Sequence, residues 1–119
     1  MSYLGSHLSS ARGYLAMGRT ALAMGADTFA FFLRNPRGGA ARAVAPEDIL
    51  ALRALLEEHR FGPLVAHAPY TLNPCGKDPR VLAFARSALA EDLARMELMP
   101  GQLYNLHPGS HVGQGPDAG

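Results

Sequence analysis

Short apolar runs alternate with stretches of helical periodicity along the chain, and this alternation constrains the fold more than any other feature. The four runs span residues 3–6, 28–33, 64–66 and 103–106. Three longer stretches between them repeat their apolar residues every three or four positions, as amphipathic helices do. Strands that alternate with helices form parallel sheets. The sequence therefore predicts a parallel α/β fold in the order βαβαβαβ.

Each expected helix has a residue suited to its first turn. Ser9 or Ser10 is placed to cap the first helix, and Pro46 opens the second. Asp78 is placed to cap the third. The apolar spacing of that third helix predicts a core-facing stripe made of Leu82, Ala85, Leu89, Leu93 and Met96.

The second and fourth runs carry further information about the sheet. Residues 28–33 are apolar without alternation, which predicts a strand buried on both faces. After residues 103–106 only a Gly-rich tail follows, and half of an eight-fold βα barrel has this order, since a complete barrel needs about 250 residues. We therefore expect residues 1–119 to form a single partial domain, the amino-terminal half of a TIM barrel truncated after the fourth strand.

Composition sets weaker limits. No apolar run is long enough for a membrane span, and the amino terminus lacks the pattern of a secretion signal. Cys75 is the only cysteine, so an internal disulfide is excluded and a reducing cytoplasm is favoured. Residues 1–46 hold five arginines against one acidic residue, whereas the remainder holds six basic and nine acidic residues. The arginines of residues 34–42 suit a phosphate-bearing partner and suit an ordinary solvated loop equally well.

Two histidines follow neighbouring strands. His67 ends the third apolar run and His107 the fourth, and the long helix between them makes those strands parallel neighbours about 4.8 Å apart. Either histidine alone is more often structural. At the carboxyl ends of adjacent strands, the pair favours binding to one metal ion. Asp78 is the acidic residue nearest to these strand ends and is better suited to a helix cap, so the site looks incomplete.

Four segments in this order resemble the endonuclease IV family, also called deoxyribonuclease IV or apurinic/apyrimidinic endonuclease family 2. They are Leu4-Gly5-Ser6-His7, Asn35-Pro36-Arg37, His67-Ala68-Pro69-Tyr70 with Asn73, and His107-Pro108-Gly109-Ser110-His111. The resemblance spans nearly the whole chain, and the last two segments are its most specific part. It implies a TIM barrel with a three-zinc site at the carboxyl ends of its strands.

The resemblance also implies an activity. In the family, a metal-activated water hydrolyses the phosphodiester 5′ to an abasic site in double-stranded DNA and leaves a 3′-hydroxyl and a 5′-deoxyribose phosphate. Histidines matching His67 and His107 bind the same zinc there, and the remaining ligands come from later strands. We therefore expect residues 1–119 alone to be inactive, and the complete protein to be a monomeric, cytoplasmic DNA repair enzyme without a membrane partner.

Further residues match DNA-contacting or supporting positions. Arg37 and Tyr70 match side chains that enter the base stack at the lesion, and Asn35 lies in the same motif as Arg37. Thr71 stands where the family often has an aliphatic residue directly after the tyrosine. The part of this loop that is expected to enter the DNA groove is therefore less apolar here. His7 and His111 are candidates for supporting the metal ligands from the second coordination shell.

Two other functions fit the same residues. A sugar isomerase or epimerase on the same barrel would also bind divalent metal at strand ends and would need no intercalating side chains. A non-catalytic module could bind phosphate or nucleic acid through Arg34, Arg37 and Arg42, with salt-sensitive affinity and no zinc requirement.

Overall fold

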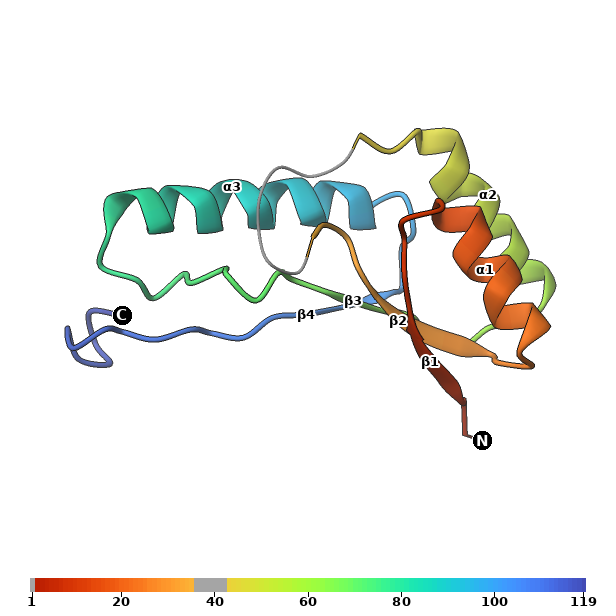
Figure 1. The fold of residues 1–119 in the computed structure, drawn as a ribbon, viewed down its shortest axis with the longest axis horizontal. Coiled ribbons are helices and arrows are strands. Elements are labelled where there is room, and N and C mark those ends of the chain that lie inside the picture. The colour runs from red at the N-terminus through yellow and green to blue at the C-terminus, as the bar shows by residue number, and fades with distance from the viewer. Residues whose placement is uncertain (1, 36–42) are drawn as a thin grey trace.

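The structure, a computed structural model, describes residues 2–35 and 43–119, in which four strands alternate with three helices (Figure 1). The order is β1 (Gly5–Leu8), α1 (Tyr14–Ala23), β2 (Thr28–Phe32), α2 (Pro46–Glu58), β3 (Val65–His67), α3 (Pro79–Met96) and β4 (Leu103–Asn105). The predicted βαβαβαβ order is confirmed. Within the described ranges, no helix is long and apolar enough to cross a membrane.

The strands form one parallel sheet in the order β1-β2-β3-β4. Its register places Phe32 beside His67, and His67 beside Asn105. Because directly paired residues of neighbouring strands point to the same face, these three residues share one face of the sheet. His7 pairs with Ala30, two residues before Phe32, and belongs to that face as well.

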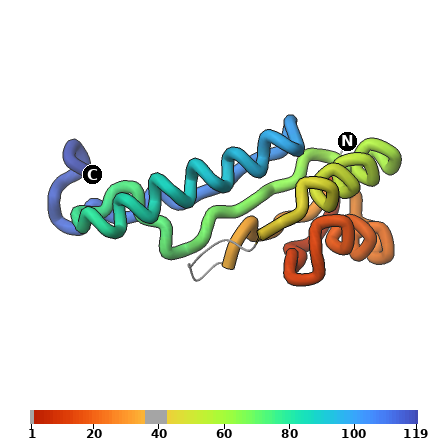
Figure 2. The backbone as a smooth tube through the Cα atoms, turned by 90° about the horizontal axis from the view of Figure 1, so that it is seen from above, coloured from red at the N-terminus to blue at the C-terminus, as the bar shows by residue number. Residues whose placement is uncertain are grey.

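The other face carries the main core. Phe29 and Phe31 of β2 are almost fully buried there and pack against residues of α1, α2 and the end of α3. α1 and α2 lie side by side in both views, while α3 lies along the segments that follow β3 and β4 (Figures 1 and 2). Burying a Phe or Leu side chain contributes about 1.5–3 kcal/mol, so this helical layer holds the sheet in shape. The buried residues of α2 are Ile49, Leu52 and Leu56, which repeat every three or four positions as expected of an amphipathic helix.

The prediction that β2 is buried on both faces is wrong. Phe29 and Phe31 are buried, whereas Thr28, Ala30 and Phe32 are only partly buried. In the described part of the chain, all three helices lie on the same side of the sheet (Figure 1). The strand therefore alternates between a dry face and a partly open one, although its sequence does not alternate in polarity.

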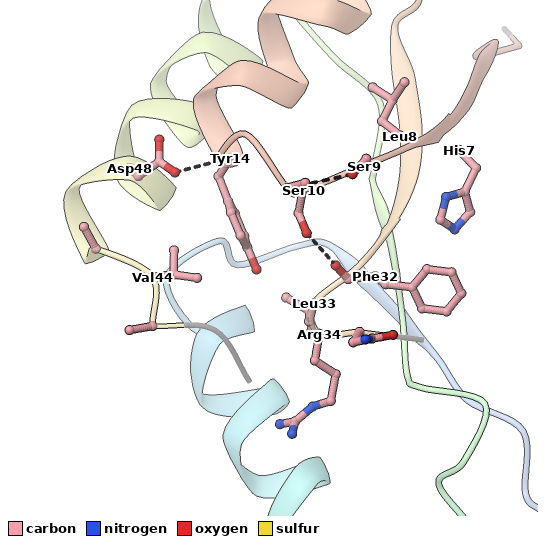
Figure 3. A pocket seen from close by; sticks show the side chains of 15 residues that line it. His7, Leu8, Ser9, Ser10, Tyr14, Phe32, Leu33, Arg34, Val44 and Asp48 are labelled. Carbon is pink, nitrogen blue, oxygen red and sulfur yellow. Dashed lines mark hydrogen bonds between the residues drawn. The ribbon is translucent and has the colours of Figure 1, made fainter. Parts of the chain in front are cut away.

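The predicted serine cap of α1 is also wrong. The helix begins at Tyr14, after Gly13, and the Asp48 carboxylate of α2 accepts hydrogen bonds from the backbone N–H groups of Tyr14 at 2.6 Å and Leu15 at 3.1 Å. Ser10 instead donates to the Phe32 carbonyl oxygen at 3.1 Å, as Figure 3 shows. A carboxylate supplied from a neighbouring helix satisfies the first turn of α1 and complements its dipole.

The buried face of α3 differs from the predicted apolar stripe. Asp78 caps the helix as expected, by accepting from the Arg80 backbone N–H at 2.7 Å. Leu93, however, is 50% exposed, and Asp92 is fully buried. The face that packs inward is Ala85, Ala88, Asp92 and Met96. The helix is thus turned so that an acidic side chain enters the interior, where a charge requires partners.

Candidate metal centre at the carboxyl ends of the strands

The two strand-end histidines lie next to each other. His67 is the last residue of β3 and is partly buried, and His107 is exposed two residues beyond β4. Their ring centroids are 5.2 Å apart. The pairing of β3 with β4 sets this distance, because the Ala68 N–H donates to the Asn105 carbonyl oxygen at 2.9 Å and extends the ladder beyond His67.

The orientation of His67 leaves one ring nitrogen available. Its Nδ1 atom faces the carbonyl oxygen of Ala68 at hydrogen-bond distance. A carbonyl oxygen can only accept, so this contact favours the tautomer with the proton on Nδ1 and the lone pair on Nε2. Backbone carbonyls orient many metal-binding histidines in this way.

The spacing of the two rings fits one shared metal ion. Two imidazole nitrogens about 2.0–2.1 Å from a tetrahedral zinc ion put their ring centres about 5 Å apart. The observed 5.2 Å agrees with that value. In residues 2–35 and 43–119, no group of three or more His, Cys, Asp or Glu side chains could hold a metal. The pair can therefore supply two ligands of a site that needs others.

Tyr70 completes a cluster of rings around the histidine pair. It is 64% exposed, and its ring centroid lies 5.7 Å from that of His67 and 6.4 Å from that of His107. Phe32 packs beneath it, 5.2 Å from Tyr70 and 5.1 Å from His67. An exposed phenol ring supported by a second aromatic ring is a suitable platform for a planar ligand group. Sequence reasoning missed Phe32, which its place at the end of β2, level with His67, could have indicated.

The two histidines proposed as supporting residues lie at different places. His7 packs against Phe32 with ring centroids 4.9 Å apart and the ring planes tilted by 42°, so Phe32 lies between His7 and His67. His111 lies in the loop after β4, where its Nδ1 accepts from the backbone N–H groups of Gly113 at 3.1 Å and Gly115 at 3.3 Å. His7 therefore borders the ring cluster, while His111 orders its own loop. A direct role in supporting metal ligands stays a prediction for both.

A cavity of about 790 Å³ lies beside the ring cluster, at the carboxyl ends of β1 and β2 (Figure 3). His7, Ser10, Tyr14 and Asn35 contribute to its lining. It therefore adjoins the candidate metal centre without containing His67 or His107. Arg37 lies outside the described residues, so its predicted contact with DNA stays a prediction, as does that of Asn35.

Arg34 lies two residues beyond the end of β2 and is buried in an ion-pair network that sequence reasoning missed. Its Nε and Nη2 atoms donate to Asp92 at 3.0 and 2.9 Å, and Nη2 also donates to Glu91 at 2.9 Å. Tyr104 donates to the second Asp92 oxygen at 2.7 Å. Figure 3 shows the Arg34 side chain extending from the end of β2 toward α3. With 2% of its side chain exposed, Arg34 is not a surface ligand for phosphate.

The network shifts the pKa values of Arg34 and Tyr104. Burial, the largest single influence, disfavours the Arg34 cation, but its hydrogen bonds to Asp92 and Glu91 and their negative charge outweigh burial, and the pKa of Arg34 is raised. Burial also raises the pKa of Tyr104, and the hydrogen bond to Asp92 adds to that shift. The network therefore keeps a charged Arg34 and a neutral Tyr104 phenol between the end of β2, α3 and β4.

The fold and the strand-end site define a class of protein. Residues 19–119 match the model of a family described as xylose isomerase-like TIM barrel, and the chain belongs to that family. The predicted fold class, the amino-terminal half of a TIM barrel with parallel strands, is thereby confirmed.

Within this class, the chain is similar to endonuclease IV, as its motifs predict. It is 59% identical to a protein of Akkermansia muciniphila and 51% identical to one of Alkaliphilus oremlandii, both named probable endonuclease 4, over 100% of this chain in each case. The crystal structure of endonuclease IV from Thermus thermophilus superposes on 92% of this chain with a TM-score of 0.82 and 33% identity. The chain spans 43% and 42% of the two curated relatives and 41% of the crystallised chain.

Proposed function

We propose that the complete protein is a zinc-dependent endonuclease of the endonuclease IV type, which hydrolyses the phosphodiester 5′ to abasic sites in double-stranded DNA. The observation that carries this proposal is the His67–His107 pair, 5.2 Å apart and bordered by the exposed ring of Tyr70, on a chain whose relatives are named endonuclease 4. The products would be a 3′-hydroxyl and a 5′-deoxyribose phosphate. We propose that residues 1–119 supply one part of a single barrel domain.

In this proposal His67 and His107 hold one zinc ion together. His67 would bind the ion through Nε2, because Nδ1 faces the Ala68 carbonyl oxygen. The pairing of β3 with β4 keeps the His107 ring close enough to bind the same ion. Bound zinc would supply a Lewis acid that lowers the pKa of the attacking water and stabilises charge on the phosphate. Because the described residues offer only this pair, residues 1–119 alone should not cleave DNA.

The remaining site residues would bind the damaged duplex. The Tyr70 ring is exposed and backed by Phe32, so it can stack on a base exposed when the damaged nucleotide leaves the helix. The absence of a base lowers the cost of extruding that nucleotide, which would favour abasic DNA. Arg37 and Asn35 are proposed to contact the same DNA.

The proposal can be tested with the complete protein that the gene encodes and a duplex carrying one abasic site. We expect a single cut on the 5′ side of the lesion that leaves an end a polymerase can extend. Chelation should abolish the cut, and added zinc should restore it. Cutting at equal rate in undamaged duplex, or cutting that survives complete chelation, would contradict the proposal.

A sugar isomerase remains a second candidate, because the family description that matches this chain refers to xylose isomerase. The two functions differ in what they require of Tyr70. A sugar isomerase needs no side chain that enters a base stack, so weaker binding of Tyr70→Ala to abasic DNA is expected only for the proposed endonuclease. Metal-dependent aldose isomerisation by the complete protein, without DNA incision, would favour this second candidate.

A further inference from the structure

Asn73 joins the loop after β3 to the loop after β4. Its Oδ1 atom accepts hydrogen bonds from the backbone N–H groups of Cys75 at 3.2 Å and Ser110 at 3.1 Å. Its Nδ2 atom donates to the Ser110 carbonyl oxygen at 3.1 Å. One amide side chain thus binds both backbone groups of a residue 37 positions away, as a strand partner would.

Gly109 makes this close approach possible. Its φ is +87°, a conformation that residues with a side chain rarely adopt. A Cβ atom added there would lie 2.0 Å from Asn73 Oδ1. Asn73, Gly109 and Ser110 therefore form one tightly fitted unit, which we call the Asn73 clamp.

The clamp is the second of two connections between the loops that carry the candidate metal centre. The two chain segments are joined once where the Ala68 N–H donates to the Asn105 carbonyl, and again at Asn73 and Ser110. Tyr70 lies between the two connections on one segment, and His107 lies between them on the other. Both segments thus have each end fixed, although both side chains are exposed.

The loop after β3 is also packed against the protein interior. Leu72, directly before Asn73, is 3% exposed and packs in a small core cluster with Ala85 and Ala88 of α3. The amide of Asn73 therefore extends from a buried support, and Ser110 is held relative to that support. A rigid support of this kind is what a metal ligand outside the regular sheet requires.

We infer that Asn73 is a positioning residue, which fixes His107 and Tyr70 relative to His67 through the clamp. This inference rests on the proposed function, because it assigns the clamp to the metal centre formed by these histidines. In the described residues Asn73 makes no hydrogen bond to His67, His107 or Tyr70; it bonds to the backbone of both loops and acts through it.

The first readout requires no metal. In the metal-free complete protein, hydrogen exchange of the Ser110 amide should speed up in Asn73→Ala, since that amide loses its acceptor. The Leu103 amide, which donates to the Leu64 carbonyl within the β3–β4 ladder, should be unchanged and shows that the sheet is intact. Asn73→Asp keeps the acceptor and removes the donor, so it should protect Ser110 better than alanine does.

The second readout is zinc affinity at the site, defined as the binding that His67→Ala removes. We expect Asn73→Ala to raise its dissociation constant about tenfold, as loss of support for metal ligands typically does. Gly109→Ala should weaken zinc binding as well. Gly101→Ala is the matched control, because Gly101 has a similar φ of +89° with no atom within 4 Å of its added Cβ. Once Asn73 is alanine, adding Gly109→Ala should weaken zinc binding little further.

Two different failures can be told apart. Zinc affinity within twofold of wild type in both Asn73→Ala and Gly109→Ala, with Ser110 exchange accelerated, would overturn the positioning role and leave the proposed function standing. Zinc binding that is unaffected by His67→Ala and His107→Ala would contradict the proposed metal centre, and the inference with it. If Asn73→Ala does not fold, the comparison of Gly109→Ala with Gly101→Ala decides the question alone.

Discussion

The helix-covered face and the carboxyl ends of β3 and β4 are built by different means. On the covered face, Phe31, Leu52 and Leu64 are fully buried, and packing holds them. At the strand ends His107 and Tyr70 are exposed, and a few backbone hydrogen bonds hold the loops that carry them. The comparison teaches that the fold and the candidate site can fail separately. Substitutions in one region should reduce stability, and those in the other should reduce activity.

The largest expected effect tests the strand ends. His107→Ala in the complete protein should reduce abasic-site incision by about 10³-fold or more, because the shared metal ion loses one of its ligands. Its free energy of unfolding in metal-free buffer should change by less than about 0.5 kcal/mol, since the side chain is exposed. Incision kinetics and urea denaturation measure the two quantities. A loss of stability large enough to explain the loss of incision would contradict the proposed separation between the two regions.

The next effect tests the interior. Asp92→Ala leaves the Arg34 cation buried without its main partner and should lower the free energy of unfolding by about 3–5 kcal/mol. Glu91 bonds to the same arginine but is 55% exposed, so Glu91→Ala should cost no more than about 1 kcal/mol. Urea denaturation of both variants measures the difference. If Asp92→Ala lowers the free energy of unfolding as little as Glu91→Ala does, the buried network does not contribute as proposed.

A smaller effect is expected at Tyr70. Tyr70→Ala should weaken binding to abasic duplex by about 1–3 kcal/mol, the contribution of one stacked base, while zinc content and stability stay unchanged. Tyr70→Phe keeps the ring and is the matched control. Fluorescence anisotropy with a labelled abasic duplex measures the affinity. Loss of affinity in the phenylalanine variant equal to that in alanine would assign the effect to the hydroxyl instead of to stacking.

The smallest effect concerns the start of α1. Asp48→Ala should lower the free energy of unfolding by about 1–2 kcal/mol, because it removes the acceptor for two N–H groups. Ser9→Ala, at the cap expected from sequence, should cost less than about 0.5 kcal/mol. Thermal or urea denaturation compares them. The reverse ranking would restore the serine as the effective cap.

The features that sequence predicted follow from signals in neighbouring residues and from one rule about parallel strands. The starts of α2 and α3 depend on Pro46 and Asp78, which act on the residues next to them. The proximity of His67 and His107 follows from two strands and the helix that separates them. Each of these predictions required only periodicity, caps and the rule that parallel strands align their carboxyl ends.

The features that sequence missed depend on partners far along the chain. Asp48 caps a helix that begins 34 residues earlier, and Arg34 pairs with Asp92, 58 residues later. The apolar period of α3 predicted a buried Leu93, but the helix is turned so that Asp92 is buried instead. The period could not reveal this, because it does not show that Asp92 has a buried partner in Arg34. Asn73 belonged to a recognised motif, yet its bonds to Ser110 could not be derived from spacing.

The most direct measurement of the central claim is the zinc content of four forms of the complete protein: wild type, His67→Ala, His107→Ala and the double variant. If both histidines bind the same ion, each single variant should lose one zinc per molecule relative to wild type. The double variant should lose that same single zinc and no more. Loss of two zinc ions in the double variant, or no loss in any variant, would contradict a shared metal centre at the ends of β3 and β4.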